Sequence, residues 1–265
     1  KGCRKFIIGI GGSATTEGGI GMLSALGYDF MNENGDILPP VFASLEKVVQ
    51  IENNRVPEVL KDCHFQIACD VTNPLCGAQG CVYVFGAQKG VKEEEKESMD
   101  RAMQSYAACL EKFTGKKFSE IPGTGAAGGL GFAFLWGLPN VELKPGIDIV
   151  LEAVGLTNEL KDADVVVTGE GCLDFQTAMG KVPVGVAKTA KNYNCKVIAF
   201  AGSVTEEAKK CNEKGIDAFF SILPGVCSLD EAMDTEIAQK NMRNAAEQVF
   251  RLILACGKEK SSLHP

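Results

Sequence analysis

The sequence predicts an α/β fold, and its length, its hydrophobicity pattern and its glycine distribution lead to that prediction. At 265 residues and 45% hydrophobic, the chain can form one large domain or two small ones. Beyond residue 150, strand-like and helix-like segments alternate regularly, which is typical of a parallel sheet covered by helices. The first 150 residues are richer in glycine and less regularly spaced. We therefore expect a domain boundary near Leu151, with domains at 1–150 and 151–265.

The first domain is expected to combine short strands with one long helix. The helix follows from Met99, Met103, Tyr106 and Leu110, which recur at spacings of three and four. Gly115 can end it in a left-handed cap. The other expected elements are strands at 6–10, 65–69 and 83–85, a helix at 18–26, and a hairpin of 28–31 with 37–38 around the turn at 32–35; the long helix spans 92–113.

The second domain is expected to be a β-α-β-α-β-α series. Ser228 and Glu231 have the spacing of a capping box at the start of the last helix, and Gly257 can end it. The expected strands are 165–168, 196–201 and 218–222, and the expected helices are 182–191, 206–214 and a long one reaching residue 256.

Composition excludes several classes of function. Lys and Arg total 27 against 34 for Asp and Glu, so the net charge of −7 argues against nucleic acid as a partner. No apolar run approaches the ~20 residues that a membrane span requires, so we expect no membrane partner. The eleven cysteines are odd in number and lack C-x-x-C spacing, which predicts free thiols in a cytoplasmic protein. With only two histidines, catalytic proton transfer must depend on carboxylates.

The segment 164–181 carries the strongest functional signal. An apolar strand, expected to be buried on both faces over 165–167, leads into a glycine loop and then a helix beginning near Val182. The loop brings Glu170, Asp174 and Lys181 together with an amide and a hydroxyl. The carboxyl end of a strand and the amino end of a helix are where α/β proteins bind anions. This set of groups suits phosphoryl transfer, although Glu170 and Asp174 could instead cap the helix that follows.

A second glycine loop, residues 9–14, fits the dinucleotide pattern G-x-G-x-x-A, and Asp29 lies where a ribose-binding acid would be expected. However, Asp29 precedes a hairpin turn instead of ending a second parallel strand. We therefore favour binding of phosphate or carboxylate through Ser13, Thr15 and backbone N–H groups over an NAD site.

Two further segments can each be interpreted in two ways from the sequence. Residues 123–128 spell G-x-G-x-x-G without a preceding strand, so they either let a helix pack closely or form a cleft wall. Asp70 and Asn73 follow a strand and either orient a hydroxylated substrate or Mg²⁺, or stabilise an Asx turn. Lys89 and Lys144 are either solvated or partners of phosphate.

Three blocks of sequence resemble a known family. The block 9–19 is similar to Gly-Gly-Ser-Ala-Thr-Asn-Asp-Gly-Gly, 69–77 to Asp-Val-x-Asn-Pro-Leu-x-Gly, and 169–177 to Gly-Glu-Gly-Arg-Ile-Asp-Ser-Gln-Thr of bacterial glycerate kinases, which use ATP to phosphorylate D-glycerate. Residues 85–90, 123–131 and 143–148 also have counterparts. The chain departs from the family at Glu17, Cys172, Phe175 and Met179.

The resemblance implies two α/β domains: a Rossmann-like parallel-sheet domain, represented here by its C-terminal half, and an inserted α/β domain at 1–150. The family begins with a strand and a loop of the type Asp-Ser-Phe-Lys-Gly, which this sequence lacks. We therefore expect the chain to be incomplete at its amino terminus.

The resemblance also implies roles for the residues singled out above. Asp174 would accept the proton of the glycerate hydroxyl or orient that hydroxyl, and Glu170 is the next candidate for this role. Lys181 would offset phosphate charge. The expected cofactors are ATP and Mg²⁺, with Asp70 and Glu170 as metal contacts, and the expected product is 2-phospho-D-glycerate. A non-catalytic sensor of a small phosphorylated acid and an NAD-dependent oxidoreductase are the alternatives. The expected substrate- or phosphate-binding residues are Gly11, Gly12, Ser13, Thr15, Asp70, Asn73, Gly125, Gly128, Gln176 and Thr177.

Overall fold

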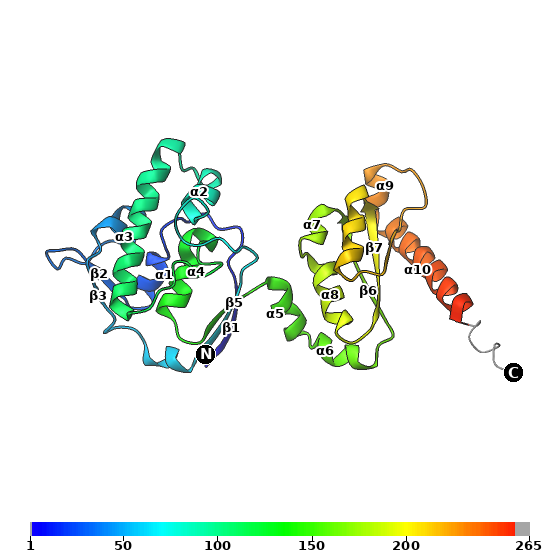
Figure 1. The fold of residues 1–265 in the computed structure, drawn as a ribbon, viewed down its shortest axis with the longest axis horizontal. Helices are drawn as coiled ribbons and strands as arrows, with labels where there is room; N and C mark the ends of the chain where they lie inside the picture. The colour runs from blue at the N-terminus through cyan, green and yellow to red at the C-terminus, as the bar shows by residue number, and fades with distance from the viewer. Residues whose placement is uncertain (1, 258–265) are drawn as a thin grey trace. The chain divides into compact units, whose positions relative to one another are not determined.

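The structure, a computed structural model, describes residues 2–257 (Figure 1). It divides into two compact units, one up to Ile149 and one from Val150. Both combine helices with a parallel sheet, so the α/β class is confirmed. That the units correspond to an inserted domain and to half of a Rossmann-like domain stays a prediction.

The first unit is built around the parallel sheet β1-β4-β5. Its strands are β1 (Lys5–Gly9), β2 (Asp29–Met31), β3 (Gln50–Glu52), β4 (His64–Ala68) and β5 (Val141–Lys144). Its helices are α1 (Ile20–Ala25), α2 (Cys81–Phe85), α3 (Lys96–Thr114), α4 (Ala126–Gly137) and the first half of α5 (Gly146–Ala153), with short 3₁₀ helices η1 (Phe42–Lys47), η2 (Glu58–Asp62), η3 (Ala87–Lys89) and η4 (Glu93–Glu95).

The register of the first sheet places three strand ends at one edge. Gly9 of β1 lies opposite Ala68 of β4, which in turn lies opposite Lys144 of β5. The loops that follow β1 and β4 therefore leave the sheet side by side, at the carboxyl edge where parallel sheets bind ligands.

Helix α4 links this edge to the core of the unit. Its first turn is irregular, because Ala127, Gly128 and Gly129 all have positive φ. A Cβ at Gly128 would lie 2.1 Å from the Thr15 carbonyl oxygen, and the Gly18 N–H donates to the Gly128 carbonyl at 2.9 Å. At Gly128 the glycine therefore permits close packing of helix against loop. Figure 1 shows α3 and α4 in the body of the unit, where the core includes side chains from both helices.

The second unit contains the parallel sheet β6-β7-β8. Helix α8 packs against one face through Val184 and Ala187, and α10 packs through Val249 against Phe200 on the other. The strands are β6 (Val165–Leu173), β7 (Lys196–Val204) and β8 (Ala218–Ser221), and the helices are α6 (Leu156–Glu159), η5 (Leu160–Asp162), α7 (Phe175–Ala178), α8 (Val182–Lys191), η6 (Glu206–Lys214), α9 (Leu229–Met233) and α10 (Thr235–Gly257).

Several sequence predictions are confirmed by these elements. Helix α8 has the predicted bounds, α3 ends at Gly115 with a φ of 68°, and Ser228 and Glu231 form the predicted capping box. The expected parallel β-α-β order of the second unit is also present.

Other predictions were wrong. Residues 83–85 belong to helix α2, because Cys81 and Val82 are buried against the helical core and this packing outweighs the strand propensity of Tyr-Val-Phe. Residues 37–38 form only an isolated bridge from Ile37 to Met31, and β2 pairs with the unpredicted β3 instead. The terminal helix is divided in two at Asp234.

Strand β6 also differs from expectation. It is not buried on both faces, since Val167 is 49% exposed, and within the described residues it pairs only with β7. The strand continues to Leu173, so Glu170 lies within it and not in a loop. Asp174 follows directly and begins the next helix.

Candidate functional site

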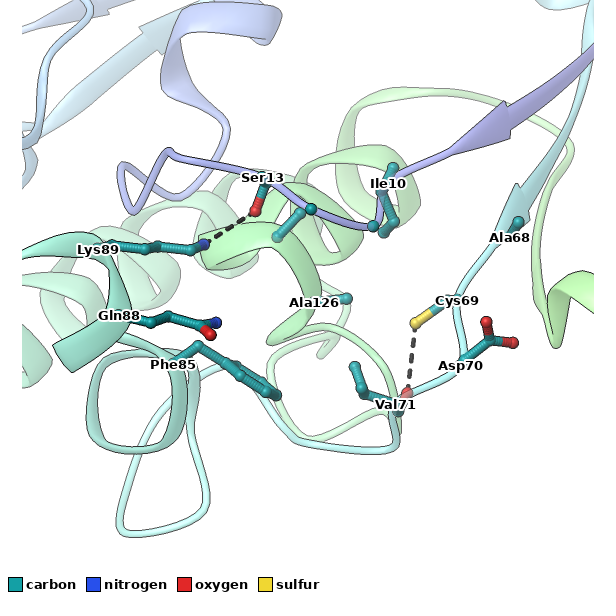
Figure 2. Close-up of a pocket in the computed structure, with 13 residues that line it drawn as sticks. Ile10, Ser13, Ala68, Cys69, Asp70, Val71, Phe85, Gln88, Lys89 and Ala126 are labelled. Carbon is teal, nitrogen blue, oxygen red and sulfur yellow. Dashed lines mark hydrogen bonds between the residues drawn. The ribbon is translucent and has the colours of Figure 1, made fainter. Parts of the chain in front are cut away.

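The first unit contains a cavity of about 430 Å³ at the carboxyl edge of its sheet (Figure 2). The loops after β1 and β4 supply four of the predicted residues, Gly11, Gly12, Ser13 and Asp70. A size of several hundred Å³ and a mixture of apolar and polar groups are typical of small-molecule sites. The remaining lining residues come from the same loops, from the segment 85–89 and from α4: Ile10, Ala68, Cys69, Val71, Phe85, Gln88, Lys89, Ala126 and Ala127.

Lys89 provides the positive charge of this cavity. Its ammonium group donates to Ser13 Oγ at 2.9 Å and to the Thr15 carbonyl at 2.6 Å. Figure 2 shows the side chain extended toward Ser13 beside the amide of Gln88. Burial lowers the pKa of Lys89 from its ordinary value, because the charged form loses solvation.

Thr15 contributes to the site through its backbone. Its hydroxyl donates to Glu17 Oε1 at 3.1 Å, while Glu17 Oε2 accepts the Gly21 N–H at 2.7 Å near the start of α1. Glu17, where the family has Asp, thus holds the loop against the helix. The Thr15 carbonyl remains for Lys89.

Asp70, Asn73 and Gly125 have partners that shape the neighbouring loops. Asp70 is exposed, and its Oδ1 accepts the Gly146 N–H at 2.8 Å. Asn73 Nδ2 donates to the Gln79 carbonyl at 2.8 Å, and the Asn73 carbonyl accepts the Gly125 N–H at 3.0 Å. A Cβ at Gly125 would lie 2.2 Å from the carbonyl oxygen of residue 74, so close packing accounts for this glycine.

The second unit brings together the predicted residues of the segment 168–181. The buried Thr177 hydroxyl donates to Glu170 and accepts the Asp174 N–H at 3.2 Å. Asp174 Oδ1 accepts the Thr177 N–H at 3.0 Å, so this carboxylate caps α7. Lys181 Nζ lies 3.7 Å from the same oxygen, and the Gln176 side chain is exposed.

The environment of Asp174 favours its charged form. The N–H of Thr177 is the main cause that lowers its pKa, and Lys181 adds to this effect, while partial desolvation opposes it. Asp174 is therefore a carboxylate at neutral pH and a weak base. It is better suited to orient a hydroxyl than to remove its proton in advance.

The described residues do not include three or more His, Cys, Asp or Glu side chains grouped as a metal site. Glu170 and Asp174 nevertheless offer two carboxylates joined through Thr177. Mg²⁺ commonly binds through one or two carboxylates together with substrate phosphates, so the Glu170 carboxylate, one of the predicted contacts, has the chemistry of a Mg²⁺ ligand. None of the described helices is long and apolar enough to cross a bilayer. All eleven cysteines are free thiols.

Sequence reasoning left the role of Lys89 open and did not include Phe85 or Gln88 in the site. The signal was present in the block 85–90, which has a counterpart in the glycerate kinases. The pairing of Lys89 with Ser13 joins residues 76 positions apart, and no local pattern in the sequence predicts it.

Comparisons with known proteins identify the family of this chain. A family model described as the glycerate kinase family matches residues 1–254. The chain is 42% identical to a glycerate kinase of Bacillus cereus over 249 residues, covering 94% of this chain and 65% of the relative. It is 43% identical to a glycerate 2-kinase of Escherichia coli over 232 residues, covering 88% and 61%.

A solved structure described as glycerate kinase 2 from Salmonella typhimurium superimposes with a TM-score of 0.82 at 40% identity, covering 96% of this chain and 66% of that one. The chain thus spans about two thirds of the length of the relatives that it matches. With the family model matching nearly all of its residues, the chain belongs to the glycerate kinase family.

Proposed function

We propose that the protein is an ATP-dependent kinase that transfers the γ-phosphate of ATP to a hydroxyl of D-glycerate. The relatives named above support the substrate and the reaction class. The observation that carries the proposal is the cluster of Glu170, Thr177, Asp174 and Lys181 at the end of a parallel strand. Phosphoryl transfer requires an oriented acceptor hydroxyl and neutralisation of charge on the transferring phosphate, and these groups match both tasks.

In this proposal Asp174 orients the acceptor hydroxyl and receives its proton as the new O–P bond forms. A weak base is sufficient, because the transition state of phosphoryl transfer is loose and proton removal can come late. Glu170 is the alternative acceptor or a contact of Mg²⁺. Lys181 offsets the charge of the transferring group from its position beside Asp174. Gln176 is exposed next to this cluster and can donate to a ligand.

The cavity of the first unit would hold one of the two substrates. Ser13 and the glycine loop supply hydrogen-bond donors, and Asp70 retains an oxygen for a substrate hydroxyl or for Mg²⁺. Thr15, Asn73, Gly125 and Gly128 support these loops through backbone contacts. When bound with ATP, Mg²⁺ would neutralise phosphate charge.

The expected product is 2-phospho-D-glycerate, in line with the name of the Escherichia coli relative. We also propose a cytoplasmic location, because eleven free thiols suit a reducing compartment.

The test is release of ADP by the full-length protein with D-glycerate, glyceraldehyde or hydroxypyruvate as acceptor. We expect ADP release that depends on D-glycerate and on Mg²⁺, and a phosphorus NMR spectrum of the product that identifies the 2-phosphate. Equal ADP release with and without every acceptor would contradict the proposal.

A further inference from the structure

The hydrogen-bond donors around Lys89 are only partly used by the protein. An ammonium group has three N–H donors, and two of those on Lys89 are taken by Ser13 Oγ and the Thr15 carbonyl. Ser13 accepts from Lys89, so its own hydroxyl hydrogen remains to be donated. One N–H and one O–H therefore remain available beside the cavity.

The glycine loop adds backbone donors at the same place. Among the described residues, the N–H groups of Gly11, Gly12 and Ser13 have no hydrogen-bond acceptor, in contrast to that of Gly18, which donates to α4. Gly12 has a φ of 66°, and alternation of left-handed and ordinary backbone is how successive N–H groups turn toward one anion.

Packing does not explain the glycine at position 11. Gly11 has no positive φ, and a Cβ built there would meet no atom within 4 Å. Because this residue lines the cavity, close approach of a ligand to its backbone accounts for the missing side chain.

The charges of the cavity indicate what kind of ligand fits. Lys89 forms no ion pair with any residue in the described part of the chain. Lys89 and Asp70 are the only Lys, Arg, Asp or Glu residues among the described lining residues, so the lining carries one positive and one negative charge. A partly buried ammonium without a counter-ion favours an anionic ligand.

We propose that Lys89, Ser13 and the N–H groups of residues 11–13 form one anion-binding site, which takes a carboxylate of the hydroxy acid or a phosphate group of the nucleotide. The site rests on the proposed kinase function for the identity of its ligand. A single positive charge matches a monoanionic carboxylate better than a triphosphate, so the charge balance favours the hydroxy acid.

The experiment is calorimetric titration of this chain with D-glycerate, ADP and inorganic phosphate separately, at low ionic strength. We expect wild-type protein to bind at least one of these anions. Lys89→Gln should weaken that binding at least ~10-fold, a loss of about 1.4 kcal/mol. Lys89→Arg should retain most of it. Lys116→Gln, on an exposed lysine of the same unit, is the matched control and should leave binding unchanged.

Amide NMR on the wild-type chain gives a second readout that does not depend on a variant folding. Binding should shift the amide signals of Gly11, Gly12 and Ser13. Failure of all three anions to bind at millimolar concentration, or wild-type affinity in Lys89→Gln, would overturn the site. Binding through Lys89 without ADP release by the full-length protein would keep the site and refute the kinase.

Discussion

The hydroxyl of Thr177 donates to the carboxylate of Glu170 and thereby ties strand β6 to the first turn of α7. The same oxygen accepts the N–H of Asp174 at 3.2 Å. One fully buried hydroxyl therefore fixes the spacing of the two carboxylates on which the proposed chemistry depends. We expect Thr177 to position both groups.

Replacing Thr177 tests this role. Thr177→Val keeps the shape but leaves the Glu170 carboxylate and the Asp174 N–H without their partner, which should cost about 1–3 kcal/mol of stability. In full-length protein we expect kcat with D-glycerate to fall ~10-fold with little change in KM, and Thr177→Ser to restore most of it. If Thr177→Val is less stable in thermal melting yet turns over normally, the hydroxyl serves only the fold.

Asp174→Asn separates charge from capping. Asparagine also accepts the N–H bonds of a helix start, so α7 and the melting temperature should be preserved. Loss of the negative charge should lower kcat by ~10²-fold or more, as expected for a proton acceptor. Asp162→Asn, an exposed carboxylate of the same unit, is the control. Turnover that survives Asp174→Asn but not Glu170→Gln would exchange the two roles, and survival in both would leave them as structural residues.

The affinity of the Lys89 site for anions should depend on pH. Burial lowers the pKa of Lys89, so the ammonium is lost at a lower pH than in an ordinary lysine. Binding should be strongest below that pKa and weaken as the pH rises through it. Calorimetric titrations across the neutral to alkaline range measure this decline, and Lys89→Arg, which keeps its charge, should show no such decline. A parallel loss of affinity in both proteins would place the titrating group elsewhere.

Two glycine substitutions should affect different properties of the protein, one its anion binding and the other its stability. Gly11→Ala meets no neighbouring atom, so its stability should stay within about 0.5 kcal/mol of wild type while anion binding weakens. Gly128→Ala combines a φ of 67° with a Cβ 2.1 Å from a carbonyl oxygen. The left-handed conformation alone costs about 1–2 kcal/mol, and the clash adds to it. Urea unfolding measures both; equal destabilisation would show that Gly11 is needed by the fold.

Whether the sequence predicts an element of this fold depends on how far apart along the chain the residues that stabilise it lie. Helix α3 and the capping box at Ser228 depend on spacings of three and four, and both were predicted. Strand β3 has only three residues and owes its existence to pairing with β2, which no local pattern contains. Helix α2 was mistaken for a strand because its burial is decided by distant helices.

The same distinction holds for the candidate site. Glu170, Asp174 and Thr177 are close in sequence, and a strand–turn–helix pattern was enough to group them. Lys89 could not be assigned, because its partners Ser13 and Thr15 are far away along the chain. Its pairing with the glycine loop depends on how α2 and the following turn pack.

The Thr15 carbonyl oxygen takes part in two separate interactions. It accepts a hydrogen bond from the ammonium group of Lys89, and it occupies the space that a side chain at Gly128 would need. A substitution at 128 therefore moves the acceptor of Lys89 without touching the lysine. Substitutions at the two positions should show epistasis in a double-mutant cycle: once Gly128→Ala has displaced the carbonyl, Lys89→Gln should weaken anion binding by less than it does alone.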